Sequence, residues 1–250
     1  MQKWRYLWQK VAWVGLVTYL SWLCLGNIAH PQPNSEPDLP SLQAHPLPTF
    51  MASWQESAKQ GEYFEQIETT PLGYLVWWQF PVKVFVEQPV NTQTSAANQR
   101  FQQWTTTVRQ AIAEWQTYFP LEETAASETA DIIIVRSQPE REIKLNPDTG
   151  LFDIPRAVAA TTRYEFYLME SPQVIAHRMT VEVSPNFTGV SLLATVRHEL
   201  GHALGIWGHS SQETDALYFS QVSDPPSISP RDLNTLRKIY QQPTRLGWKF

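Results

Sequence analysis

Three histidines and one glutamate lie between residues 198 and 209 of a chain that contains six histidines in all. His198 and His202 are four residues apart, so on a helix they lie about 40° from each other on one face. Two imidazoles one turn apart fit a tetrahedral zinc ion, and Glu199 beside them can accept a proton from an attacking water. In a chain of this composition the H-E-x-x-H pattern arises by chance about once in a hundred sequences. The spacing therefore predicts a metal site that activates water.

The residues after this pair extend the pattern. Gly205 can adopt a left-handed conformation, which would end the helix and reverse the chain. The reversal would return His209 to the metal as the third protein ligand. A fourth position would then remain for water, as a catalytic zinc ion requires.

In the surrounding segments, the spacing of apolar residues predicts three helices and four strands, which together suit a mixed sheet covered by helices. Apolar and aromatic residues at spacings of three and four predict an amphipathic helix over 97–119, which Pro120 stops. A second helix, 189–205, carries the histidines; its apolar stripe would face the core, and both imidazoles would point into open space. A third helix begins after Ser229 as N-cap, with Pro230 in its first turn and Asp232 three residues after the cap. Four segments read as strands: 74–88, 130–137 (buried on both faces), 157–169 and 174–184.

The N-terminal region differs from the rest of the chain. Residues 1–10 are basic and aromatic, and residues 11–29 carry no charge over a length close to the ~20 residues that span a bilayer as a helix. This pattern predicts a signal peptide or an N-terminal membrane anchor over residues 1–30, and the length of the apolar run favours the anchor. Six prolines then lie in 31–48, so we expect a linker over 31–64 that packs no core and leaves His45 solvated. The globular domain would cover 65–250, outside the cytoplasm.

Charge and cysteine content exclude two classes of function. All 24 acidic residues lie after residue 30, together with all but three of the 19 basic ones. Such a body would repel nucleic-acid phosphates, so a nucleic-acid partner is not expected. Cys24 is the only cysteine, which excludes an intramolecular disulfide and a cysteine-based metal site.

The segment 198–210, HELGHALGIWGHS, resembles the metzincin signature H-E-x-x-H-x-x-G-x-x-H, and its last serine is similar to that of the matrixin branch. Residues 111–135 resemble the matrixin first helix and the strand after it, and 228–241 resemble the C-terminal helix. The resemblance implies an α+β, metzincin-like catalytic domain: a twisted mixed β-sheet with a long first helix, an active-site helix and a C-terminal helix. It also implies a zinc-dependent metalloendopeptidase that binds one catalytic Zn²⁺ and cleaves a protein or peptide substrate. The substrate would lie extended along an edge strand, for which 157–166 is the best candidate.

Within this resemblance, His198, His202 and His209 would bind the zinc ion and Glu199 would act as the general base. One extra residue, Gly208, precedes His209, so Asp215 is kept as a fallback ligand. Leu217 stands where the family has a methionine that packs beneath the metal, which leucine can replace. In the family a cysteine before the catalytic domain can keep the enzyme latent, and no cysteine lies between residue 30 and the domain here. Residues 146–150 show only the pattern of a turn, so the sequence does not decide whether calcium binds.

Several alternatives remain open from the sequence. The extra residue before His209 and Leu217 would also suit a catalytically lapsed, zinc-stabilised binding module. A different peptidase class would need Glu213 on a helix as third ligand, and its surroundings are not helical in pattern. His177 is expected in the core or at a sheet edge as a hydrogen-bonded side chain, and Tyr218 is expected to pack. Residues 219–229 would line the pocket on the leaving-group side of the substrate.

Overall fold

A computed structural model describes residues 39–52, 54, 60–89, 95–139, 144–145, 152–153 and 159–250. Residues 40–250 form the unit that carries every described helix and strand. The expected N-terminal segment 1–30 and the turn at 146–150 lie outside the described residues. Among the helices that are described, none combines the length and the apolar character needed to cross a bilayer.

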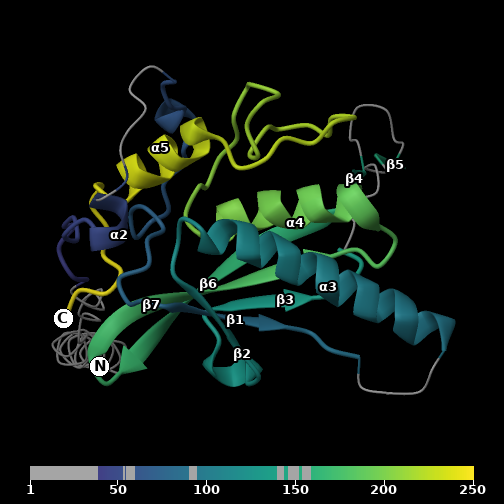
Figure 1. The fold of residues 1–250 in the computed structure, drawn as a ribbon. Coiled ribbons are helices and arrows are strands. Elements are labelled where there is room, and N and C mark those ends of the chain that lie inside the picture. Colours follow the sequence, from purple (N-terminus) through teal and green to yellow (C-terminus); the bar gives the residue numbers. More distant parts are fainter. Residues whose placement is uncertain are drawn as a thin grey trace, which may run out of the picture. The chain divides into compact units, whose positions relative to one another are not determined.

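The main sheet has five strands in the order β2-β1-β3-β7-β6 (Figure 1). Strands β1, β2, β3 and β7 pair in parallel, and β6 pairs antiparallel with β7 through a hairpin that turns at Ser171 and Pro172. Strand β6 is therefore an edge of the sheet. The strands are β1 (Val82–Val86), β2 (Leu121–Thr124), β3 (Ile132–Val135), β6 (Ala160–Glu170) and β7 (Gln173–Val183).

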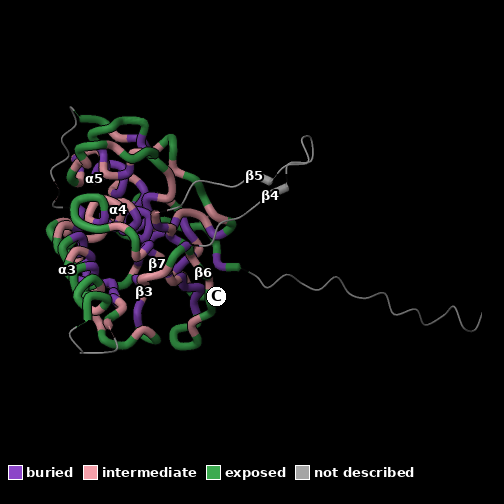
Figure 2. The backbone as a smooth tube through the Cα atoms, turned by 90° about the vertical axis from the view of Figure 1, so that its right-hand side faces the viewer, coloured by how far each residue is buried: buried purple, intermediate pink, exposed green. Residues whose placement is uncertain are grey.

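Two long helices, α3 (Ala96–Gln116) and α4 (Gly189–Ala203), lie side by side over the sheet (Figure 1). Ser95 caps α3 by accepting a hydrogen bond from the backbone of Asn98, as its position before the amphipathic run requires. Trp115 of α3 is fully buried and donates from Nε1 to the carbonyl oxygen of Arg197 on α4, at 2.9 Å. The buried residues concentrate between these helices and the strands (Figure 2).

The C-terminal helix α5 (Pro230–Ile239) begins as the sequence predicts. The Ser229 side chain accepts from the backbone of Asp232, and the Asp232 side chain accepts from the backbone of Ser229, which makes a complete capping box. The smaller elements are α2 (Thr49–Ala52), β4 (Lys144–Leu145), β5 (Phe152–Asp153) and two 3-10 helices, η2 (Phe64–Gln66) and η3 (Ser127–Thr129). The observed architecture is α+β with a mixed sheet, as expected.

Two strand predictions need correction. The segment 74–88 contributes only Val82–Val86 to the sheet, because backbone groups before it bond to the C-terminal part of the chain. Tyr74 donates from its backbone N–H to the carbonyl oxygen of Pro243, and Trp77 donates to the hydroxyl of Tyr240. Strand β3 is buried on one face only, since Ile132 and Ile134 are buried whereas Ile133 and Val135 are half-buried. The helices cover one face of the sheet, so its apolar residues alternate.

The prediction that the proline-rich segment packs no core is wrong for residues 40–52. Met51 is buried in the core, and Leu47 and Phe50 pack against it. The ring of His45 stacks on Trp248, with centroids 4.3 Å apart, and one ring nitrogen lies 2.7 Å from the carbonyl oxygen of Leu246. His45 is therefore not a solvated linker residue. Prolines prevent helix and central strand, but they do not prevent an extended segment from burying its apolar side chains against a finished domain.

Candidate active site

Helix α4 places His198 and His202 one turn apart with their Nε2 atoms 3.0 Å from each other. The Nδ1 atom of His198 lies 2.9 Å from the carbonyl oxygen of Ala216, and the Nδ1 atom of His202 lies 2.7 Å from that of Ile206. A carbonyl oxygen only accepts hydrogen bonds, so each Nδ1 carries the proton and each Nε2 presents a lone pair. Two lone pairs at this separation repel each other unless a cation lies between them. The pair therefore fits a metal ion.

His209 completes the cluster. Nitrogen atoms of His198, His202 and His209 all lie within 4.8 Å of one another, so one ion can contact all three. Helix α4 ends at Ala203, and Gly205 follows with a φ of 123°. A Cβ atom at Gly205 would lie 2.5 Å from the carbonyl oxygen of Leu75, so glycine is required there both by conformation and by space. The predicted reversal of the chain is observed, and it brings the third imidazole to the first two.

The extra residue before His209 has a structural reason. Gly208 forms an antiparallel bridge with Ile67, and a Cβ atom at position 208 would overlap the carbonyl oxygen of Gln66. The backbone N–H of Glu68 donates to the carbonyl oxygen of Trp207 at 2.9 Å. The longer loop thus reaches an N-terminal segment that packs against it, and His209 still meets the other two histidines.

The histidine face of α4 is covered, which corrects the expectation that both imidazoles point into open space. His202 is buried and His198 is half-buried, because β6 and the segment 206–217 pack over this face. Burial lowers the pKa of His198 and of His202 to about 4 each, and it also lowers the pKa of His209. All three imidazoles are therefore neutral at pH 7, and a neutral imidazole is the form that binds a metal.

Glu199 lies beside the cluster in a buried position that the sequence did not foresee. The hydroxyl of Thr162 on β6 donates to Oε2 of Glu199 at 2.6 Å, which fixes the carboxylate. Burial raises the pKa of Glu199, while the nearby histidines and this hydrogen bond act in the opposite direction. Thr162 carried no sequence signal, because only the packing of β6 against α4 brings it to the carboxylate.

The fallback ligand Asp215 has a structural role instead. It is fully buried and accepts hydrogen bonds from the hydroxyls of Ser210 (2.5 Å) and Ser229 (2.7 Å) and from Nε of Arg231 (3.0 Å). Its oxygens are thus engaged away from the histidines. Glu213 is exposed in a turn and does not belong to the histidine cluster, so the alternative that relied on it is not supported.

Leu217, which stands where the resemblance has a methionine, packs against the helix that carries two of the histidines. It is fully buried, and its Cδ2 atom would lie 2.5 Å from a Cβ atom at Gly201 of α4. Its backbone carbonyl oxygen accepts from Ser210, next to His209 in sequence, at 2.8 Å. Leu217 therefore packs against the metal-binding helix and ties the loop of the third histidine to it.

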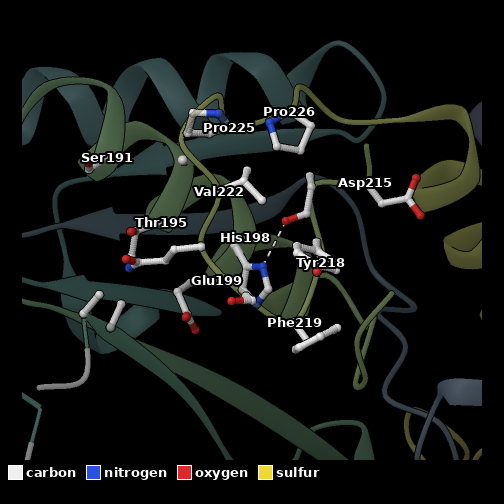
Figure 3. Close-up of a pocket in the computed structure, with 16 residues that line it drawn as sticks. Ser191, Thr195, His198, Glu199, Asp215, Tyr218, Phe219, Val222, Pro225 and Pro226 are labelled. Atoms are coloured by element: carbon white, nitrogen blue, oxygen red, sulfur yellow. Dashed lines mark hydrogen bonds between the residues drawn. The ribbon is translucent and has the colours of Figure 1, made fainter. Parts of the chain in front are cut away.

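Two cavities meet at His198 and Glu199. The first, of about 200 Å³, is bounded by α4 and by residues 215–226, including Tyr218 and Phe219 (Figure 3). Residues 219–222 and 225–226 of the predicted pocket segment do line it. Tyr218 lines this cavity as well, so it does more than pack. The second cavity, of about 350 Å³, lies along Thr161 and Thr162 of β6 and along the loop that carries His209.

His177 lies in the core, as expected, and takes no part in the metal site. Only 1% of its surface is exposed, and its ring stacks on Trp77 with centroids 3.8 Å apart. The expected hydrogen bonds are missing, since neither ring nitrogen has a partner among the described residues. Burial lowers the pKa of His177 to about 3, so the ring is neutral and packs like an apolar side chain.

Comparison with known proteins agrees with this geometry. The sequence profile of the matrixin family matches residues 89–241, which include α3, every strand of the main sheet except β1, and the three histidines. No curated protein matches the sequence. The matched region spans more than half of the chain, and its three convergent imidazoles fit the catalytic zinc ion of the family. The chain therefore belongs to the matrixin family of zinc metalloendopeptidases.

Proposed function

We propose that this matrixin hydrolyses peptide bonds of proteins outside the cytoplasm, with Glu199 as the general base. The observation that carries the assignment of Glu199 is its position next to His198 on α4, at the junction of the two cavities. A substrate strand that lies along the edge strand β6 would cross this junction, because both cavities include Ala160 of β6. Its scissile bond would then meet the carboxylate.

Each side chain has a defined task in this reaction. His198, His202 and His209 would hold the zinc ion, which supplies Lewis-acid polarisation of the substrate carbonyl and makes water more acidic. Glu199 accepts a proton from the attacking water and passes it to the leaving amine, so that the amine departs in neutral form. Thr162 donates to Oε2 and so holds the carboxylate, and Oε1 of Glu199 would accept the proton from water. Burial raises the pKa of this carboxylate, which favours its role as proton acceptor.

The test of the general base is Glu199→Gln, which keeps the size of the side chain but removes its basicity. We expect full zinc content and at least a hundredfold loss of kcat/KM on a quenched peptide or casein, within the range typical of a general base. Glu65→Gln, an exposed glutamate of η2 that lines neither cavity, is the matched control and should keep its activity. Unchanged cleavage by zinc-loaded Glu199→Gln would exclude this role.

The proposed location rests on residues 11–29, whose uncharged apolar run follows the basic residues of the N-terminus. A helix of that length inserts with its positive end in the cytoplasm and leaves the following domain on the other side. Protease added to intact cells that express the full chain should digest residues 40–250. Retention of the chain in carbonate-washed membranes would show an anchor, and its release would show a cleaved signal. Protection of the domain in intact cells would exclude the proposed location.

A further inference from the structure

Glu68 belongs to the active-site cleft although it lies outside the residues that the family profile matches. It follows η2, and its backbone N–H donates to the carbonyl oxygen of Trp207 in the loop between α4 and His209. The neighbouring residue Ile67 forms the bridge to Gly208. Two backbone links therefore fix this segment against the metal-binding loop, so the position of Glu68 is determined by the fold and not by its exposed side chain.

The second cavity has an acidic and aromatic lining. Glu68, Glu199, Trp207 and the three histidines all line it; Glu68 and His209 are exposed, whereas Glu199 and His202 are buried. Among the described residues that line this cavity, none is a lysine or an arginine. The indole of Trp207 is held by Tyr164 of β6, with ring centroids 5.1 Å apart in an edge-to-face arrangement.

The two cavities follow each other along β6. Ala159 lines only the first, Thr161 and Thr162 line only the second, and His198 and Glu199 line both. A peptide extended along this edge would place residues on opposite sides of its scissile bond in different cavities. The matrixin relationship puts the first cavity, with residues 219–226, on the leaving-group side. The second cavity then receives side chains from the N-terminal side of the scissile bond.

We infer that Glu68 is a specificity-determining residue that favours a lysine or arginine on the N-terminal side of the scissile bond. This inference rests on the proposed function and adds a substrate class to it. The apolar stem of such a side chain would lie against Trp207, and its cationic end would meet the Glu68 carboxylate at the solvent-exposed rim. The charge of a bound zinc ion acts on the substrate whether or not Glu68 is present. A comparison at position 68 therefore isolates the effect of its carboxylate.

The experiment uses the full chain loaded with zinc and a set of quenched peptides that differ at one residue. Arg, Gln or Glu is placed in turn at each of the three positions before the scissile bond. For the wild type we expect kcat/KM at one of these positions to be about two- to fivefold higher with Arg than with Gln, as an exposed ion pair allows. This ratio should fall toward one in Glu68→Gln and with rising salt, and Glu68→Lys should favour the Glu peptide.

Glu65→Gln is the matched control, because this glutamate of η2 lies three residues away, is exposed and lines neither cavity. It should keep the Arg-to-Gln ratio of the wild type. Zinc content and thermal melting establish that each variant is folded. An unchanged ratio in folded Glu68→Gln and Glu68→Lys would overturn the inference while cleavage itself upholds the proposed function. Absence of any chelator-sensitive cleavage by the wild type would instead overturn the proposed function and this inference with it.

Discussion

Leu217 packs directly against Gly201, so closely that its Cδ2 atom would lie 2.5 Å from a Cβ atom at that position. Gly201 lies between Glu199 and His202 on α4, and Leu217 follows Ala216, whose carbonyl oxygen orients the His198 ring. The contact therefore fixes the distance between the helix that carries two ligands and the segment that orients one of them. A leucine performs this packing role in place of the methionine of the family.

Truncation of Leu217 tests this packing role. Leu217→Ala should lower the free energy of unfolding by about 2–5 kcal/mol, because a fully buried leucine leaves a cavity. Leu217→Met should cost less than about 1.5 kcal/mol, since the volume is conserved. Urea unfolding of the zinc-loaded protein measures both. Val190→Ala, at a position of α4 that is 67% exposed, is the control and should lie within about 0.5 kcal/mol of the wild type. Equal losses for Ala and Met would contradict the packing role.

Gly208 is expected to tolerate no side chain. Gly208→Ala places a methyl group on the carbonyl oxygen of Gln66, so the segment 64–68 or the loop must move. We expect a loss of about 1–3 kcal/mol in unfolding free energy, typical of overpacking, together with weaker zinc binding by the shifted His209. Gly189→Ala is the comparison, because Gly189 has a positive φ of 57° but open space around it. That variant should lose stability without any change in the zinc dissociation constant. Wild-type zinc affinity in Gly208→Ala would show that the bridge to Ile67 is dispensable.

The three histidines should differ in how much each contributes to zinc affinity. Backbone carbonyls orient the rings of His198 and His202, whereas no such bond holds His209 among the described residues. Removal of each ligand by substitution with alanine should abolish chelator-sensitive cleavage, and His209→Ala should retain the most zinc. Competition with a chromophoric chelator measures the three affinities.

Zinc should also raise the melting temperature of the wild type, since it binds only the folded site, and this rise should be smaller in the alanine variants. Equal melting of all variants with and without zinc would contradict the assignment.

His177 should make the fold sensitive to acid. Its pKa is lowered by burial to about 3 in the folded chain, whereas an unfolded histidine titrates near 6.5. Between these values the unfolded state binds the proton and the folded state does not. Stability must therefore fall as the pH falls from about 6.5 toward 3, by at most about 1.4 kcal/mol per pH unit from this group. Above pH 6.5 the group has no effect.

The variant His177→Leu removes this titration while keeping an apolar partner for Trp77. Urea unfolding of the wild type and the variant, both with chelator so that zinc binding does not contribute, should give curves of stability against pH with different slopes below pH 6.5. The wild type should have the steeper slope, and the difference should vanish above that pH. Parallel curves over the whole range would show that His177 takes up its proton equally in the folded and the unfolded state, which would contradict the prediction.

Much of the fold follows from local sequence patterns. The helix at 96–116, the capped helix after Ser229 and the hairpin at Ser171 and Pro172 all lie where periodicity and capping residues predict them. Strand 74–88 was predicted too long, because the residues before Val82 bond to the C-terminal segment, which no local pattern reveals. The packing of residues 40–52 was missed for the same reason. Their partners, such as Leu246 and Trp248, lie some 200 residues away.

The sequence by itself determined the chemistry at the centre of this protein, because the spacing of His198, Glu199 and His202 on one helix face depends only on helix geometry. Tertiary structure decided what surrounds that chemistry. It buried the histidine face of α4 and placed Thr162 where its hydroxyl binds Glu199. It also brought His209, despite its longer loop, within reach of the other two histidines, and it placed Glu68, from outside the matched region, in the cleft. These contacts join segments that are distant along the chain. Their formation depends on which surfaces of the finished fold meet, and a local pattern of residue types carries no information about that.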